Sequence, residues 1–407
     1  MLISLAVIIL AGLFAAAVCD RLHLPRIVGM LVTGIVCGPY MLDVLDSSIL
    51  SISAELRQIA LIIILVKAGI TLDISDLKKV GRPALLLSFV PATFELAAYV
   101  VLAPMLLPVN RMEAALMGAV LAAVSPAVVV PRMVSYIEGG YGTEKSIPQM
   151  ILAGASCDDV FVIVLFSSFL SMVQGGHMRA ADFAGIPISI LSGMLTGAAV
   201  GYCLGGFFES AFSRGHLIRN SMKVLIVMGM AFLLMSVESG LKDRVPVSGL
   251  LAVVSMACVL KMRSTAFVSD RLAEKFGKLW IGAEVMLFVL VGAAVDIRYT
   301  LAAGPAAAAM ILLALLVRSA GVVLSVAGTD LNSREKLFCV IAYLPKATVQ
   351  AAIGSVPLAA GLPCGSIILS VAVLGILLTA PLGAFGMDLT YRRYLQKEER
   401  DGVRSAE

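Results

Sequence analysis

Long apolar stretches constrain the fold of this chain more than any other feature of its sequence. About thirteen runs, each near the ~20 residues that cross a bilayer core, follow one another with short polar connections. Of the 407 residues, 60% are hydrophobic and 14% are charged, too few charges to cover the core of a soluble protein. The sequence therefore predicts an all-α polytopic membrane protein with about 13 transmembrane helices. The expected helices are 2–19, 27–45, 56–72, 84–107, 112–136, 148–173, 186–208, 222–238, 246–261, 279–295, 302–327, 336–358 and 365–388.

The Lys and Arg residues indicate how these helices are oriented. They concentrate in every second connection and in the C-terminal tail, and such connections usually face the cytoplasm. The N-terminus is therefore expected outside and the C-terminus in the cytoplasm. Because the basic residues lie in short loops between apolar runs, the small positive net charge predicts no nucleic-acid partner. The seven cysteines are scattered, with neither metal-ligand spacing nor a disulfide framework.

Two of the expected helices contain prolines in their interiors. One includes Ser125-Pro126 and Pro131, and the other includes Pro345-Lys346. Proline removes a backbone donor and clashes with the preceding turn, so Pro126, Pro131 and Pro345 are expected to break or kink both helices. If helices 2–6 and 9–13 form two five-helix repeats, the broken helix is the fourth member of each. Repeats of odd length are inverted in a membrane, and transporters of that kind bind substrate between their interrupted helices.

Two adjacent carboxylates lie inside another apolar run. Asp158 and Asp159 are the only charged residues between Pro148 and Val173. Ionisable groups at this depth cost several kcal/mol and usually mark an ion or proton pathway. Two neighbouring carboxylates cannot easily ionise together in a low-dielectric site, so at least one is expected to hold a proton or a cation.

Four polar features are expected at one depth. A rise of ~1.5 Å per residue places Asp158, Ser125, Arg318 and Lys346 roughly 13–17 Å from the cytoplasmic ends of their helices. Arg318 is the natural partner of an aspartate, although a purely structural role is also open. Lys346 is expected to neutralise the carbonyl ends exposed at its helix break rather than to carry transport chemistry.

Other intramembrane groups have weaker signals. Ser125 and the opened backbone carbonyls of its helix can supply neutral oxygen ligands, although a serine in a membrane helix is more often a packing residue. Lys67 and Glu95 are expected to form a structural ion pair. A structural ion-pair network is also the alternative for Asp158 and Asp159.

Several of these stretches resemble one known family. They are Leu24-Pro25-Arg26-Ile27-Val28-Gly29 through Gly38-Pro39, the run 59–69, the run 123–131, Asp158-Asp159, and the run 344–356. Over nearly the whole membrane part, the chain resembles a cation–proton antiporter of the NHA type, in the sodium/proton antiporter superfamily. The resemblance implies the NhaA- and NapA-like fold, with two inverted five-helix repeats and two broken crossing helices.

The resemblance also implies roles for individual residues and a quaternary structure. Asp159 takes the role of the ion-binding carboxylate for Na⁺ or Li⁺, and Asp158 pairs with Arg318. Many relatives with the aspartate pair carry lysine at the position of Arg318 and are electrogenic, so the arginine leaves the proton stoichiometry open. At the position of Lys67 the relatives carry arginine. The family implies a homodimer in which a core domain moves against a dimerisation domain, as in an elevator.

These implications divide the single transporter unit, 1–407, into expected segments. Dimerisation-side helices with the start of each repeat are expected at 1–110 and 222–301. Core helices are expected at 111–173 and 302–388, with a linker helix at 174–221 and a short cytoplasmic tail at 389–407.

The predicted function is antiport of Na⁺ (or Li⁺) and H⁺, which compete for Asp159 and Asp158, in a cell (inner) membrane and without a cofactor. A K⁺/H⁺ antiporter, a channel-like K⁺ efflux protein of the same superfamily and a transport-inactive sensor remain alternatives. An enzyme is not predicted, because an intramembrane aspartyl protease would carry its two aspartates on separate helices.

Overall fold

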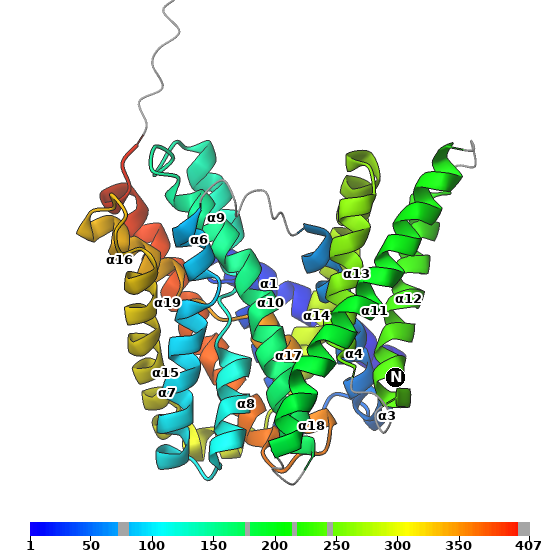
Figure 1. The fold of residues 1–407 in the computed structure, drawn as a ribbon. Helices are drawn as coiled ribbons and strands as arrows, with labels where there is room; N and C mark the ends of the chain where they lie inside the picture. The colour runs from blue at the N-terminus through cyan, green and yellow to red at the C-terminus, as the bar shows by residue number, and fades with distance from the viewer. Residues whose placement is uncertain (72–80, 176–179, 214–217, 242–246, 398–407) are drawn as a thin grey trace, which may run out of the picture.

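The computed structural model describes residues 1–71, 81–175, 180–213, 218–241 and 247–397, and these residues form a helical bundle (Figure 1). In this part of the chain the only extended pairing is an isolated bridge between Tyr141 and Lys397. By length and composition, nine of the described helical segments can cross a membrane, and two shorter apolar helices accompany them. Each of the expected apolar runs coincides with one helix or a few consecutive helices, whereas the count of 13 spans stays a prediction.

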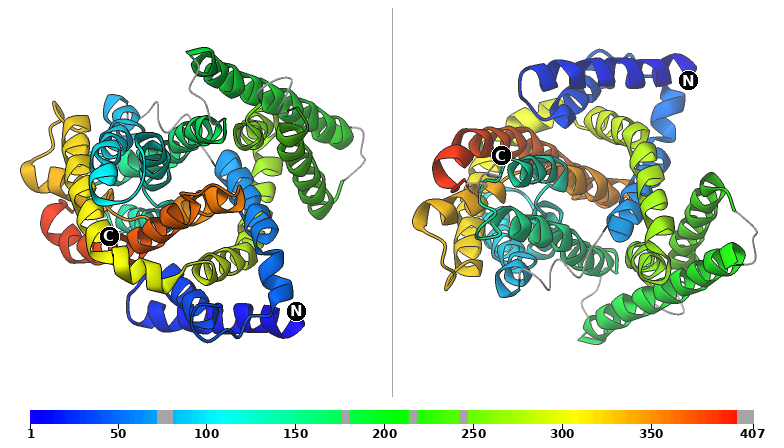
Figure 2. Two further views of the ribbon diagram at one scale, coloured as in Figure 1. Left: turned by 90° about the horizontal axis from the view of Figure 1, so that it is seen from below. Right: turned by 90° about the horizontal axis from the view of Figure 1, so that it is seen from above.

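The helices pack in two groups (Figures 1 and 2). We call the first the scaffold group. In the end-on views of Figure 2, its helices α11 and α12 lie at one edge of the bundle, and its helix α1 lies at another edge. The scaffold group comprises α1 (Leu2–Arg21), α2 (Arg26–Cys37), α3 (Ser47–Ser51), α4 (Ser53–Thr71), α11 (Ala180–Ser213), α12 (Asn220–Leu241), α13 (Gly249–Arg263) and α14 (Ala266–Ala293).

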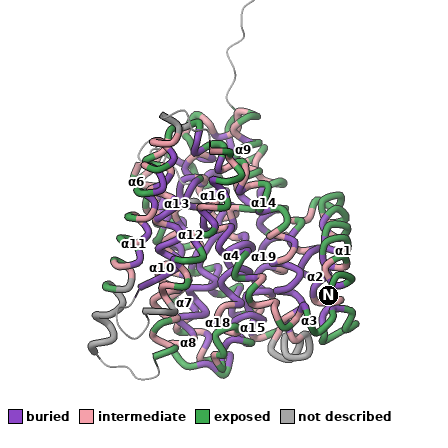
Figure 3. The backbone as a smooth tube through the Cα atoms, turned by 90° about the vertical axis from the view of Figure 1, so that its right-hand side faces the viewer, coloured by how far each residue is buried: buried purple, intermediate pink, exposed green. Residues whose placement is uncertain are grey.

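The second group, called the site group, occupies the left and the centre of Figure 1. Buried residues concentrate in the interior of the bundle, and exposed residues lie at its ends and along outer helices such as α1 (Figure 3). The site group comprises α6 (Arg82–Leu87), α7 (Val90–Leu106), α8 (Arg111–Leu121), α9 (Pro126–Glu138), α10 (Ile147–Gln174), α15 (Ile297–Ser325), α16 (Ser333–Ala342), α17 (Thr348–Gly354), α18 (Val356–Ala359) and α19 (Gly365–Tyr394).

Helices α6 and α7 fall within the expected segment 1–110, but they pack against α10, α15 and α8 and so belong to the site group. Helix α11 falls within the expected linker, 174–221, but it packs against α13 in the scaffold group. The end of the predicted tail, 398–407, and parts of the predicted linker, 176–179 and 214–217, lie outside the described residues.

Small residues bring the scaffold helices close together. Gly193, Gly197 and Gly201 recur at every fourth position of α11 and face α13. A Cβ atom at Gly197 would overlap the backbone carbonyl of Ala252, and the other two glycines meet the α13 backbone in the same way. Close backbone approach of this kind stabilises helix pairs in lipid, where burial of apolar surface supplies no driving force.

Both broken helices are interrupted at the expected places, but not at every expected proline. The first is open between Leu121 and Pro126, and the second between Ala342 and Thr348. Pro126 is the first residue of α9, a position where its missing N–H has no helical partner to lose. The expectation of a break at Pro131 is wrong, because α9 continues through it, as membrane helices can when neighbouring groups compensate.

The two broken helices begin with the same local structure. Asn110 caps α8 in a capping box with Glu113, and Asn332 caps α16 in a capping box with Glu335. Each box satisfies backbone N–H groups that would otherwise lack partners at a helix start. In Figure 1, α8 lies toward the lower end of the bundle and α16 toward the upper end. The capping boxes are thus a residue-level trace of the inverted repeat.

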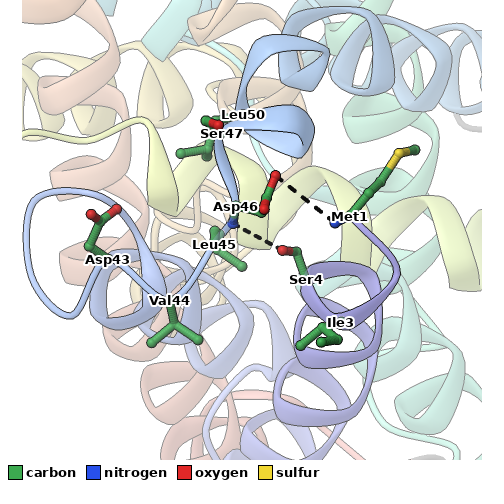
Figure 4. Close-up of a pocket in the computed structure, with 9 residues that line it drawn as sticks. All are labelled: Met1, Ile3, Ser4, Asp43, Val44, Leu45, Asp46, Ser47 and Leu50. Carbon is green, nitrogen blue, oxygen red and sulfur yellow. Dashed lines mark hydrogen bonds and ion pairs between the residues drawn. The ribbon is translucent and has the colours of Figure 1, made fainter.

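A surface pocket of about 550 Å³ lies beside the start of α1 and the α2–α3 connection (Figure 4). Within it, the Ser4 hydroxyl accepts a hydrogen bond from the Asp46 backbone N–H, 3.0 Å away. The Asp46 side chain caps α3, and its hydrogen bonds with Ser48 lower the pKa of the carboxyl group below its ordinary value. The pocket shares no lining residue with the charged cluster described next.

Candidate functional site

The two helix breaks cross each other in the interior of the site group. The Ser125 N–H donates a hydrogen bond of 2.8 Å to the carbonyl of Pro345, so the two interrupted backbones meet directly. Ser125 and Lys346 are fully buried, and Asp158, on α10, is buried beside them. A helix break deep in a membrane leaves backbone groups without helical partners, and these must be satisfied by other protein groups.

The orphaned carbonyls at the end of α8 are capped one after another by side chains from the second half of the chain. Lys346 Nζ donates to the carbonyl of Leu121, and an Arg318 guanidinium N–H donates to that of Ala122. Gln350 Nε2 donates to the third carbonyl, that of Ala123, at 2.7 Å. Three consecutive carbonyls of repeat 1 are therefore held by three donors of repeat 2.

Glu95, on α7, joins the two basic residues. Arg318 Nη1 lies 2.7 Å from Glu95 Oε2, and Lys346 Nζ lies 2.8 Å from Glu95 Oε1. All three side chains are at most 1% exposed. Because breaking such a buried pair leaves an uncompensated charge at a cost of several kcal/mol, Glu95 holds both basic side chains against the break of α8 and α9.

Asp158 is bound on one side only. Its Oδ2 accepts the backbone N–H of Val124 at 2.7 Å and lies 3.4 Å from Arg318 Nη2. Its Oδ1 is buried and has no hydrogen-bond partner within the described part of the chain. The expected pairing of Asp158 with Arg318 is present in the structure, and Arg318 also donates to the carbonyl of Tyr343.

Among the described residues, no basic side chain forms an ion pair with Asp159. Its side chain is buried, at 9% exposure, and its Oδ1 makes no hydrogen bond to the described residues. The Ser125 hydroxyl is buried and unpartnered in the same way. Carboxylate and hydroxyl oxygens are ligands of hard cations, so Asp159 Oδ1, Asp158 Oδ1 and Ser125 Oγ are three buried oxygens suited to a small cation or a proton.

The formal charges of the cluster leave one negative charge in excess. Arg318 and Lys346 are positive, and Glu95, Asp158 and Asp159 are negative. A net charge in a low-dielectric interior is expensive. Binding of a single monovalent cation or a single proton brings the cluster to neutrality.

The predicted Lys67–Glu95 ion pair is wrong. Lys67 belongs to α4 in the scaffold group, where its ammonium lies 5.8 Å from the ring centroid of Trp280 and interacts electrostatically with Glu284. Glu95 belongs to the site group and is held by Arg318 and Lys346 instead. Hydropathy predicts the depth of Lys67 and Glu95 in the membrane, but it does not predict toward which neighbouring helix each side chain points.

The expectation that opened carbonyls of this helix serve as ligands stays a prediction, although three of them already accept hydrogen bonds from protein donors. The carbonyls of Leu121, Ala122 and Ala123 each accept one hydrogen bond from a side chain of repeat 2. The sequence also gave no role to Gln350, although it stands four residues after Lys346, one turn along the same broken helix. An amide there can both donate and accept, and this is the signal that could have identified it.

Comparison with known proteins decides the family. A model of the family described as "Sodium/hydrogen exchanger, transmembrane" matches residues 5–388, which is nearly the whole chain. The chain belongs to the sodium/hydrogen exchanger family. It is therefore a multi-pass membrane protein of a transporter family.

Individual relatives and a solved structure agree with this family. Sodium/hydrogen exchanger 9B2 of Mus musculus is 35% identical over 389 residues, which cover 92% of this chain and 69% of that protein. Sodium/hydrogen exchanger 9B1 of Homo sapiens is 32% identical over 352 residues, or 83% and 66%. The sodium proton antiporter MjNhaP1 of Methanocaldococcus jannaschii, solved at pH 8, superposes with a TM-score of 0.80 over 96% of this chain and 97% of that chain. At 22% identity, that match confirms the predicted antiporter fold class of this family member.

Proposed function

We propose that this member of the sodium/hydrogen exchanger family exchanges Na⁺ or Li⁺ for H⁺, with the cation and the proton competing for Asp159 and, beside it, Asp158. The observation that carries the proposal is the buried Asp159, whose Oδ1 has no hydrogen-bond partner among the described residues, in a cluster with one negative charge in excess. Either substrate neutralises the cluster, so either loaded state can cross the low-dielectric interior. Binding of both the cation and the proton would leave the cluster with a net positive charge. The two substrates therefore bind in turn, and this alternation produces exchange.

Ser125 supports the proposal as a neutral ligand. Its hydroxyl is buried, has no partner among the described residues, and belongs to the helix break whose Val124 N–H holds Asp158. Arg318, Lys346 and Glu95 compensate one another's charge and position the break. The exchange requires no cofactor, since the transported cation and the proton are the only reactants.

The packing supports an elevator-type cycle in a homodimer. Every residue of the charged cluster lies in the site group, so this group can move as a unit against the scaffold group. The scaffold group, whose α1 is largely exposed, is the part we assign to the dimer contact. We place the protein in a cell (inner) membrane with the N-terminus outside and the C-terminus in the cytoplasm.

The test is cation-induced proton movement in proteoliposomes, with Na⁺, Li⁺ and K⁺ tried separately. Wild type is expected to respond to Na⁺ or Li⁺. Asp159→Asn, which keeps the shape but cannot ionise, is expected to abolish the response. Asp388→Asn is the matched control, because Asp388 pairs with Arg132 at a partly exposed position, where ion pairs contribute about 0–1 kcal/mol.

Each alternative function has its own outcome. A wild type that responds to K⁺ and not to Na⁺ indicates a K⁺/H⁺ antiporter. Cation flux without proton movement indicates a channel, and the absence of any flux in folded protein indicates a sensor. Normal exchange by Asp159→Asn would show that the ion site lies elsewhere.

A further inference from the structure

Gln350 joins the two helix breaks through both ends of its amide. Its Nε2 donates to the carbonyl of Ala123 at 2.7 Å, and its Oε1 accepts the N–H of Ala347 at 2.7 Å. The side chain is fully buried. It thereby connects a backbone group of the first break with one of the second.

The contact to Ala123 differs from the other two carbonyl caps. Leu121 and Ala122 are capped by the cationic side chains of Lys346 and Arg318, which would repel a bound cation. Ala123 is capped by a neutral amide, and it stands next to Val124, whose N–H holds Asp158. Of the three carbonyls, that of Ala123 is thus the one nearest in sequence to the aspartate contact and the one without a positive charge upon it.

A carbonyl without a protein donor, one residue away from the Val124 N–H that holds Asp158, is a candidate cation ligand. Backbone carbonyls coordinate monovalent cations in membrane proteins, and the number of such oxygens helps to decide which ion is preferred. A larger ion such as K⁺ gains more from an additional neutral oxygen than a small ion that is already satisfied by carboxylates.

We propose that Gln350 is a selectivity-determining positioning residue, which favours Na⁺ over K⁺ by keeping the Ala123 carbonyl out of the cation's coordination shell. This proposal rests on the exchange function proposed above. It assigns to Gln350 an effect on the ratio of cation affinities, which a residue that only stabilises the fold would not change.

The experiment compares two Gln350 variants with a matched control. Gln350→Met keeps the volume and loses both hydrogen bonds. Gln350→Glu keeps the acceptor for the Ala347 N–H and, when ionised, loses the donor to Ala123. In the control, Thr379→Val, the lost hydrogen bond is that from the Lys346 N–H to Thr379 Oγ1, 3.0 Å long. The control disturbs the second break and releases no carbonyl of the first.

The readout is the ratio of half-maximal K⁺ to half-maximal Na⁺ concentration for proton movement in proteoliposomes. Both Gln350 variants are expected to lower this ratio about fivefold, the effect of roughly one net hydrogen-bond energy. Thr379→Val is expected to lower the maximal rate and the melting temperature while the ratio stays at the wild-type value.

The outcomes separate this proposal from the exchange function. A wild type without any cation-driven proton movement refutes the exchange function itself. If wild type exchanges Na⁺ but the ratio is unchanged in folded Gln350 variants, or shifts equally in Thr379→Val, only the selectivity role is refuted. Loss of folded protein in both Gln350 variants would assign a structural role and overturn the proposal, as would a wild type that takes K⁺ as readily as Na⁺.

Discussion

Replacing Glu95 by glutamine tests the charge network most directly. The side chain is fully buried and lies 2.7 Å from Arg318 Nη1 and 2.8 Å from Lys346 Nζ. Glutamine keeps the shape but removes the only carboxylate in the described part of the chain that contacts both basic groups. Removing one partner of a buried pair costs about 3–5 kcal/mol, which corresponds to a melting temperature lower by roughly 3–6 °C at ~2.1 cal/mol/K of unfolding entropy per residue.

The matched control is Glu335→Gln. Glu335 is also buried, at 1% exposure, and pairs with Lys145, whose side chain is 28% exposed. Lys145 can turn to water when its partner is lost, and glutamine preserves the capping box with Asn332. We therefore expect a loss of about 1 kcal/mol and unchanged exchange kinetics.

Both variants are measured by thermal unfolding in detergent and by proton movement in proteoliposomes. Glu95→Gln also removes the excess negative charge of the cluster, so its apparent affinity for Na⁺ is expected to fall together with its stability. If Glu95→Gln melts no lower than Glu335→Gln and exchanges cations like wild type, then Glu95 is not the counter-charge of the site, and the charge count given above is wrong.

Two further predictions follow from the same contacts. Because one monovalent ion neutralises the cluster, we expect one cation to exchange for one proton. Clamping the membrane potential with K⁺ and valinomycin should then leave the rate of Na⁺-driven proton movement unchanged. A rate that follows the imposed potential would contradict this stoichiometry. Gly197→Val is expected to lower the stability by about 1–3 kcal/mol through overlap with the Ala252 carbonyl, without changing the Na⁺ concentration for half-maximal exchange. Gly206→Val, on the same helix with open space at its Cβ position, is its control, and equal melting of the two variants would contradict the close packing of α11 on α13.

Depth in the membrane was the property that the sequence predicted best. The rise per residue placed Asp158, Ser125, Arg318 and Lys346 at one level, and the structure brings all four together at the crossing of two helix breaks. Depth follows from counting residues along a helix, which needs no knowledge of its neighbours.

The sequence did not predict which face of each helix points toward which neighbouring helix. Glu95 was paired with Lys67 because both are isolated intramembrane charges, yet their helices belong to different packing groups. Which face of a helix meets which neighbour depends on the packing of all the others, and no periodicity of a nearly uniform apolar helix reports it. For the same reason the contacts of Gln350 could not be predicted from the sequence, because its two partners lie on different helix breaks.

The inverted repeat was predicted from hydropathy and breaks alone, although residues also carried its trace. Asn110 with Glu113 and Asn332 with Glu335 form the same capping box at the start of each broken helix. An asparagine followed three residues later by glutamate ahead of an apolar run is a recognisable helix start. Comparing the starts of the two broken helices would have shown a residue-level correspondence.

The arrangement of donors and acceptors is consistent with the proposed control of the site by a single ion. The acceptors of the first break belong to repeat 1, and the donors Lys346, Arg318 and Gln350 belong to repeat 2. The two repeats are thus held together by contacts that no substrate needs to break. The excess charge remains with Asp159, which makes no ion pair in the described part of the chain. Under the exchange function proposed above, loading would change the net charge of the site group and leave its internal hydrogen bonds intact, as movement of that group as one body requires.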